Sequence, residues 1–271
     1  ILHGAPGTGK TYLAKKIVKE LNAVEGFVQF HPSYDYTDFV EGLRPIKKDG
    51  NNEIGFERKD GVFKAFCEKA LRAYNAAANK EYAPKFVFVI DEINRGDMSK
   101  IFGELFFSVD PGYRGPDGNI ITQYANLNDE PNEFDKALGF TDRKDYGHFF
   151  VPENVYVIGT MNDIDRSVES MDFAMRRRFA FHEITAEDSQ KAMLTPKTFE
   201  NILEKDKNLY NKCIESREDI KTRMTNLNEK IIDEKIGLSR DYQIGAAYFL
   251  KYVKYANEDE PFNKLWNNHI E

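Results

Sequence analysis

The segment GAPGTGKT, residues 4–11, decides the fold of this chain of 271 residues. It matches the pattern G-x-x-x-x-G-K-[ST], in which glycines let the backbone turn tightly and direct its N–H groups at phosphates, at the positive end of the following helix. Apolar residues at 1–3 precede the segment, and a helical pattern over 11–21 follows it. The sequence therefore predicts a strand, a phosphate-binding loop and a helix in that order.

Two side chains of this loop are expected to contact a triphosphate and its metal ion. Lys10 should reach the β- and γ-phosphates, and Thr11 should supply a hydroxyl to Mg²⁺. The other nucleotide-binding residues predicted in the loop are Gly4, Ala5, Pro6, Gly7, Thr8, Gly9 and Tyr12. The alternative is a glycine-rich turn that only starts a helix, although typical residue usage produces this pattern by chance in roughly one chain in a hundred.

The segment FVFVIDEINRG, at 86–96, ends a predicted buried strand in two carboxylates. Because open parallel sheets bind ligands at the carboxyl ends of their strands, Asp91 is predicted to hold the metal ion together with Thr11. Glu92 is predicted to accept a proton from the attacking water. Acidic residues are common where strands reach water, so these two assignments depend on the phosphate-binding loop upstream.

The segment TMNDIDRS, at 160–167, places an amide where the apolar strand VYVIG leaves the core. In a parallel sheet this strand should lie beside the strand that precedes the phosphate-binding loop. Asn162 is therefore predicted to lie near the γ-phosphate and to orient the attacking water alongside Glu92. Alternatively, Asn162 forms an Asx-turn or a helix cap ahead of Ser167, with Asp163 and Asp165 as ordinary turn residues.

Three adjacent arginines stand in DFAMRRRFAF, at 172–181. A helix C-terminus favours arginine, which explains one or two of them. Three neighbouring guanidinium groups repel one another unless anions compensate. As an arginine finger they would enter a neighbouring subunit's nucleotide site, where the phosphates are such anions, with a typical gain of ~10³ to 10⁵ in rate. We favour Arg177 and Arg178 over Arg176 for this role, and Arg95 is a further candidate for a subunit contact.

Short apolar segments alternate with helical patterns along the first part of the chain, which indicates a parallel sheet covered by helices on both faces. The expected strands are 1–3, 27–30, 86–90, 155–159 and 179–184, and the expected helices are 11–21, 62–78, 100–108 and 167–175. After 185 the apolar residues follow helical spacing. The predicted fold is a three-layer α/β/α domain over 1–185 with a five-stranded parallel sheet, followed by a small all-helical lid domain over 186–271 that is cut short.

Two connections are unusually long. Residues 41–60 contain the turn cluster DGNN between two short strand patterns and predict a β-hairpin insertion. Residues 110–150 are rich in Gly, Pro, Asp and Asn, and structureless loops of that length are uncommon in a compact domain unless they serve a function. Both insertions are expected to project from the core.

Charge and composition bear on location and partners. A net charge of −7 argues against a chain that mainly coats phosphate backbones, although Lys47, Lys48 and the 110–150 insertion leave direct DNA binding open. Apolar runs are far shorter than the roughly 20 residues of a membrane span. The two cysteines lack metal-ligand or redox spacing and fit a reducing cytosol, so a cytoplasmic location is expected. The start, ILHG without Met, is interpreted as that of an excised piece of a longer protein.

The succession GAPGTGKT, DEINRG, TMNDID and RRRF resembles the AAA+ class of P-loop NTPases, whose members form rings with nucleotide between subunits. Further segments look like the McrB-type GTPase subunit of modified-cytosine restriction systems. These are FHPSYDYTDFVEGLRP at 30–45, IDEINRGDMSKIFGELF at 90–106, GTMNDIDRSVESMDFAMRRRFAF at 159–181 and DYQIGAAYF at 241–249. The element M-N-x-x-D, here Met161, Asn162 and Asp165, is characteristic of that family, and it adds Asp165 to the predicted nucleotide-binding residues.

The resemblance covers nearly the whole chain. It implies a module that hydrolyses GTP with Mg²⁺, assembles as a hexameric ring and recruits a McrC-type endonuclease subunit. It also implies that an N-terminal domain outside this chain reads methylated DNA. The choice of guanine is implied by the resemblance alone. Two alternatives are an ATP-hydrolysing remodeller of the dynein- or MoxR-related type and a nucleotide-bound scaffold that does not hydrolyse; an intact Glu92 and Asn162 argue against the scaffold.

The helical domain departs from the family pattern at one point. In IGAAYF a histidine is expected after IG, and Ala246 cannot supply a polar group there. Arg240, in LSRDYQIG, could contact phosphates from the lid as a sensor arginine does in many AAA+ proteins. We favour the alternative that Arg240 is a surface residue.

Overall fold

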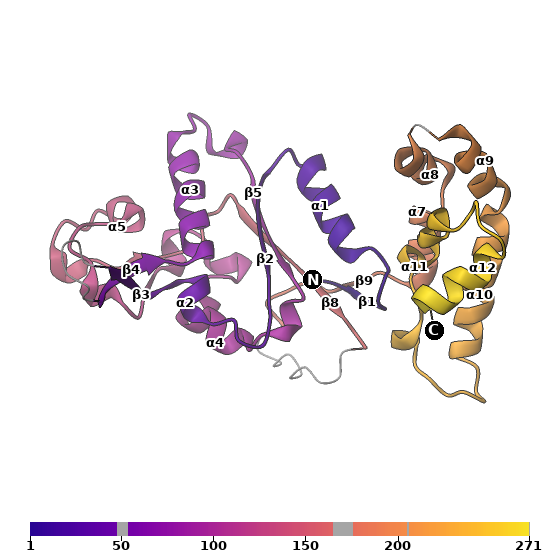
Figure 1. Ribbon diagram of the computed structural model, residues 1–271. Helices are drawn as coiled ribbons and strands as arrows, with labels where there is room; N and C mark the ends of the chain where they lie inside the picture. Colours follow the sequence, from indigo (N-terminus) through magenta and orange to yellow (C-terminus); the bar gives the residue numbers. More distant parts are fainter. Residues whose placement is uncertain (48–53, 165–175, 205, 271) are drawn as a thin grey trace. The chain divides into compact units, whose positions relative to one another are not determined.

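The computed structural model describes residues 1–47, 54–164, 176–204 and 206–270 (Figure 1). Lys48, Asp165 and the helix expected over 167–175 lie outside the described residues. The chain divides into two compact units. The first comprises Ile1, Ala14–Thr160 and Ser167–Ala180, and the second comprises Leu2–Leu13, Met161–Arg166 and Phe181–Glu271.

Five strands form one sheet in the order β2-β5-β8-β1-β9. Their bounds are β1 Leu2–Gly4, β2 Val24–Gln29, β5 Phe86–Asp91, β8 Val155–Asn162 and β9 His182–Glu183. Three pairings are parallel: β2 with β5, β5 with β8, and β1 with β9. Helices α1 Lys10–Glu20, α2 Tyr36–Phe39, α3 Val62–Ala76 and α4 Met98–Phe102 lie between strands. The predicted α/β class with a five-stranded parallel sheet is confirmed.

Two strand boundaries differ from the expectation. β2 begins at Val24 rather than 27, because its residues from Val24 on pair in parallel register with β5 from Phe86 on. Gly26 lies against the rings of Phe66 and Phe88, and a Cβ there would lie 2.5 Å from the Phe88 ring. β9 is shorter than the apolar run FAFHEI, since only His182 and Glu183 pair in register with Leu2 and His3.

Aromatic side chains build the core of the first unit. β5 is buried along FVFVI, and its Phe88 ring meets the Phe63 ring of α3 at 5.0 Å between centroids. Phe63 also stacks on Phe39 of α2 at 4.7 Å with an interplanar angle of 2°. Burying such side chains contributes about 1.5–3 kcal/mol each. The packed core fixes the direction in which β5 delivers the carboxylates that follow it.

The insertion at 41–60 contains an antiparallel pair of strands, β3 Glu41–Lys47 and β4 Ile54–Asp60, in a register that runs from Glu41 opposite Asp60 to Lys47 opposite Ile54. A buried ion network fixes the base of this pair. Glu41 and Lys64 of α3 are both fully buried and form an ion pair, and Arg58 donates to Glu41 at 2.9 Å. Glu41 also accepts the Tyr124 N–H at 3.0 Å, which joins β3 to the second insertion.

Removing one partner of this network should destabilise the first unit. Lys64→Met is expected to lower the free energy of unfolding by about 3–5 kcal/mol, because it leaves the Glu41 carboxylate buried without its ammonium partner. The matched control is Lys59→Met on β4, whose lysine is 3.6 Å from Glu57 and more than half exposed. That substitution should change stability by less than about 0.5 kcal/mol. Urea denaturation followed by circular dichroism measures both; equal midpoints would contradict the role given to the network.

The residues at 110–150 are structured rather than an irregular loop. They contain a short antiparallel pair, β6 Ile120–Ile121 with β7 His148–Phe149, and helix α5 Glu133–Leu138. Asn132 and Asp135 form a capping box at the start of α5. The Asp135 carboxylate is fully buried and also accepts the backbone N–H of His148 at 2.9 Å. A Gly- and Asp-rich composition is therefore used here for turns and caps.

The chain after Thr185 is helical in the described residues, as predicted. Its helices are α7 Ala186–Met193, α8 Pro196–Leu203, α9 Lys207–Glu215, α10 Arg217–Ile231, α11 Ala246–Leu250 and α12 Pro261–Leu265. A capping box between Thr185 and Asp188 starts α7 immediately after β9. Phe199, Ile220 and Met224 lie in the buried core of these helices.

The structure also describes the two cysteines and allows a search for membrane-spanning helices. Cys67 and Cys213 are free, buried thiols, and burial raises the pKa of each, that of Cys213 to about 11. Over the described ranges, none of the helices combines the length and the apolar character that a transmembrane span requires.

Candidate nucleotide-binding site

The loop GAPGTGKT connects β1 to α1, as the motif predicts, and belongs to the second unit. Gly4, Gly7 and Gly9 have φ values of 141°, 76° and 86°, which L-residues rarely adopt. A Cβ at Gly4 would lie 2.4 Å from the carbonyl oxygen of Ile184, so only glycine fits where β1 leaves the sheet. These backbone requirements explain the glycine spacing of the motif.

The Lys10 side chain is held inside the loop. Its Nζ donates to the carbonyl oxygens of Gly4 at 3.0 Å and Ala5 at 2.8 Å, and the residue is 7% exposed. Thr8 Oγ1 donates to the same Ala5 oxygen at 3.0 Å. The ammonium is therefore fixed at the start of α1, where the helix dipole and the loop N–H groups favour an anion.

Helix α11 and the residue before it contact the loop directly within the second unit. The N–H of Gly245 donates to Pro6 O at 2.9 Å, and the N–H of Ala247 donates to Gly7 O at 3.0 Å. A Cβ at Gly245 would lie 2.1 Å from the Gly7 carbonyl carbon, so the two backbones meet through glycine. Ala246, where a histidine was expected, is fully buried, and its N–H donates to Ser189 Oγ. Helix α11 therefore contacts this part of the loop by backbone hydrogen bonds and by the ring of Tyr248, which lies against Gly7.

The two predicted carboxylates lie at the end of β5 in the first unit. Asp91 Oδ1 accepts a hydrogen bond from Thr160 Oγ1 at 2.6 Å, and the Glu92 N–H donates to the same hydroxyl at 3.4 Å. Glu92 has φ 53° and ψ 46°, a left-handed conformation that is uncommon for residues other than glycine and often marks functional positions. Arg95 Nε donates to Glu92 Oε2 at 3.3 Å. The two carboxylates of this short segment thus have different partners, Thr160 for Asp91 and Arg95 for Glu92.

Thr160 was missed in the sequence, where it stands first in TMNDIDRS, directly after the apolar strand, and received no role. Its role follows from the pairing register of β5 and β8. Ile90 pairs with Gly159, so the next residues along the two strands are Asp91 and Thr160. A hydroxyl at that position meets the carboxylate across the strand pair.

Asn162 is the last residue of β8. The next residue, Asp163, contacts the phosphate-binding loop. The Asp163 N–H donates to Gly4 O at 3.2 Å, and the Asp163 carboxylate contacts His3 Nδ1 at 2.9 Å. Within the second unit, the structure therefore brings the segment of Asn162 to the first glycine of the loop. Thr11 and Asp91 belong to different units, and their joint metal site remains a prediction.

The arginine triplet differs in exposure along its length. Arg176 and Arg177 are exposed, whereas Arg178 is partly buried and its guanidinium lies 4.1 Å from the centre of the Phe106 ring. A cation above an aromatic face is attracted by the ring quadrupole. Arg178 thus contacts its own unit, while Arg177 extends to the surface.

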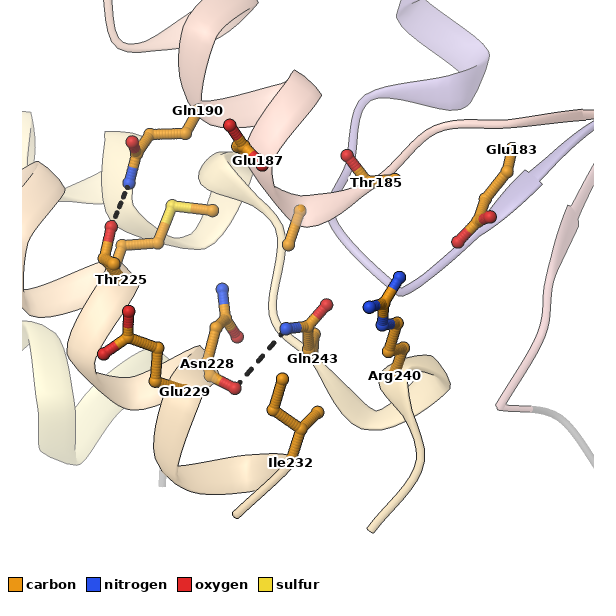
Figure 2. Close-up of a pocket in the computed structure, with 12 residues that line it drawn as sticks. Glu183, Thr185, Glu187, Gln190, Thr225, Asn228, Glu229, Ile232, Arg240 and Gln243 are labelled. Atoms are coloured by element: carbon orange, nitrogen blue, oxygen red, sulfur yellow. Dashed lines mark hydrogen bonds between the residues drawn. The ribbon is translucent and has the colours of Figure 1, made fainter.

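A separate pocket of about 490 Å³ lies in the second unit between α7, α10 and the segment before α11 (Figure 2). Its polar amides bond to neighbouring groups, since Gln190 donates to Thr225 at 3.0 Å and Gln243 donates to Asn228 O at 3.4 Å. Arg240 is exposed and lines the pocket. The residues of GAPGTGKT are not among those that line it, so this pocket is not the phosphate site.

Three features define a P-loop nucleoside triphosphatase. They are a parallel α/β sheet, a glycine loop that encloses a lysine between β1 and α1, and acidic residues at the end of an inner strand, β5. More narrowly, the chain belongs to the AAA domain family, dynein-related subfamily, whose model matches residues 1–179.

Two curated relatives are subunits of restriction enzymes. The chain is 36% identical over 256 residues to the type IV methyl-directed restriction enzyme EcoKMcrB subunit of Escherichia coli K12, covering 92% of this chain and 46% of that protein. It is 28% identical over 215 residues to the type II restriction enzyme BsuMI component YdiS of Bacillus subtilis 168, covering 71% of this chain and 59% of that protein. The chain thus spans about half the length of the curated relatives it matches, and it is an McrB-like AAA+ NTPase.

Proposed function

We propose that this chain is the GTP-hydrolysing module of a restriction motor, which assembles as a hexameric ring and drives a McrC-type endonuclease subunit. The observation that carries the proposal is the loop that encloses Lys10 together with the left-handed turn that presents Glu92 after Asp91. The first feature is suited to bind a triphosphate and the second to activate water, so both halves of a hydrolase are present in one chain. Similarity to two restriction subunits supports the biological setting.

The donor set fits a magnesium ion. The Thr11 hydroxyl and the Asp91 carboxylate are oxygen ligands of the kind that Mg²⁺ binds, usually together with substrate phosphates. Thr160 orients Asp91 through the 2.6 Å hydrogen bond, so it supports the ligand without replacing it. When bound, the ion neutralises charge on the β- and γ-phosphate oxygens.

The protein groups have distinct roles in the proposed reaction. Lys10 and the loop N–H groups, with the other loop residues up to Tyr12, bind the phosphates, and Asp165 contributes to the nucleotide site. Glu92 accepts the proton of the attacking water, and Asn162 orients that water. Arg177 of a neighbouring subunit stabilises the charge of the transition state, with Arg178 as its neighbour in the same segment.

DNA recognition is assigned to a domain outside this chain, in agreement with the net charge of −7. The free buried cysteines suit the cytoplasm as the compartment. An ATP-dependent remodeller is the second candidate, and the matching dynein-related model is the observation that favours it.

The base preference tests the proposal directly. Purified protein should bind a fluorescent guanine nucleotide, and unlabelled GTP should displace it at a concentration at least about tenfold lower than ATP, a difference of about 1.4 kcal/mol. GTP turnover with Mg²⁺ should exceed ATP turnover at equal concentration. Lys10→Ala is the control for binding through the loop. A clear preference for ATP would identify the remodeller instead, and binding without any turnover would favour a scaffold.

A further inference from the structure

His3 and Asp163 form a polar pair at the junction of the phosphate-binding loop and the end of β8. His3 Nδ1 lies 2.9 and 3.2 Å from the two carboxylate oxygens of Asp163. The His3 and Asp163 side chains are only 24% and 17% exposed. Because a carboxylate accepts and does not donate, the proton lies on Nδ1, and the imidazole donates to Asp163.

The backbone around this pair ties three segments together. His3 O accepts the Ile184 N–H from beside β9 at 2.7 Å, so the β1 backbone is held from that side. On the other side, the Asp163 N–H donates to Gly4 O at 3.2 Å. The His3 ring also packs edge-on against Phe181 at 5.9 Å. His3 therefore has a fixed position, from which its imidazole holds the first residue after Asn162.

We propose that His3 and Asp163 are a positioning pair, which holds the Asn162 amide at a constant distance from the phosphates bound by the loop. The proposal rests on the proposed function, because it gives the pair an effect only through the role of Asn162 in orienting water. Asn162 is the last residue of β8, and the bond from the Asp163 N–H to Gly4 O fixes the backbone of the residue that follows it. A second, charge-assisted bond joins the carboxylate of the same residue to His3, which directly precedes Gly4, and fixes the Asp163 side chain as well.

Such a pair should influence turnover more than binding. Lys10 and the loop N–H groups remain in place when His3 is replaced, so nucleotide affinity should change by less than about twofold. A displaced water-orienting amide should lower kcat by about tenfold to a hundredfold, since a misplacement of about 1 Å can have an effect of that size. A general loss of stability would instead lower affinity and turnover together.

The test compares His3→Ala, His3→Gln and Asp163→Ala with a matched control, His182→Ala, an exposed histidine on neighbouring β9. His3→Gln retains an amide N–H that can donate to Asp163 and should keep most of the kcat. Asp163→Ala should resemble His3→Ala, and His182→Ala should resemble the parent protein. In an Asn162→Ala background, His3→Ala should lower kcat no further, because the group it positions is already gone.

The outcomes separate the two hypotheses. A parent protein without Glu92-dependent turnover would overturn the proposed function and the pair's role with it. Given that turnover, an unchanged kcat in His3→Ala, an additive loss in the Asn162→Ala background, or a His3→Gln variant no better than His3→Ala would each overturn the positioning role alone. Thermal melts of all variants identify any that do not fold, and the glutamine variant, closest in size, then provides the comparison.

Discussion

Replacing Glu92 by glutamine should lower the rate of nucleotide hydrolysis by about 10² to 10⁴, the range typical of a lost general base, while nucleotide binding persists. The glutamine has the same shape and can still accept from Arg95, which donates to Oε2 at 3.3 Å. It cannot accept the proton of water. The substitution therefore removes one chemical property and leaves the turn after β5 in place.

The measurement needs both a rate and an affinity. Single-turnover hydrolysis of GTP reports the chemical step, and displacement of a fluorescent nucleotide reports binding. Glu81→Gln is the matched control, since Glu81 is an exposed glutamate in the same unit and should behave like the parent protein. Unchanged hydrolysis in Glu92→Gln would remove this residue from the mechanism. A loss of binding would assign it to the nucleotide pocket instead.

The backbone at Glu92 strengthens this expectation. A left-handed conformation at a residue other than glycine or asparagine costs of order 1–3 kcal/mol, and it persists where the surroundings require it. Here the N–H of Glu92 and the carboxylate of Asp91 share the hydroxyl of Thr160. We infer that Thr160 holds the turn, so the direction of the Glu92 side chain is set by the sheet.

The parts of the site that the sequence predicts are those fixed by local geometry. Gly4, Gly7 and Gly9 are required by positive φ values within eight residues, and their pattern is visible without the fold. Asp91 and Glu92 end an apolar strand, which is also a local signal. Parallel strands alternating with helices follow from composition and period, and the clearest signal is the continuous apolar run of β5, which is buried along FVFVI.

The parts that the sequence does not predict depend on register and on distant partners. Thr160 meets Asp91 only because β5 and β8 pair with Ile90 opposite Gly159. His3 and Asp163 are 160 residues apart, and neither is unusual in its own segment. The 110–150 insertion shows no clear hydrophobic periodicity in its sequence. Its short helix and strand pair are held by the Asp135 carboxylate and by the capping box of α5 rather than by an apolar stripe.

The different exposure of the three arginines leads to the prediction with the largest expected loss of turnover. Arg178 lies over Phe106 in its own unit, whereas Arg177 is exposed. If Arg177 serves a neighbouring subunit's nucleotide, Arg177→Ala should lower turnover by about 10³ to 10⁵ in the assembled protein while leaving nucleotide affinity nearly unchanged. Arg143→Ala, at an exposed arginine paired with Asp129, is the control and should retain full turnover.

Mixing subunits distinguishes an arginine that acts in the neighbour from one that acts in its own subunit. Arg177→Ala subunits retain the loop and Glu92, and Lys10→Ala subunits retain Arg177, so each variant alone should be inactive. In an equimolar ring, about one interface in four combines an intact loop with an intact neighbouring arginine, and turnover should reappear at roughly that fraction. Activity that stays absent in mixed rings, while mixing with parent subunits shows that exchange takes place, would place the role of Arg177 within its own subunit. Because only a site shared between two subunits can be restored by two inactive proteins, recovery would link hydrolysis to ring assembly.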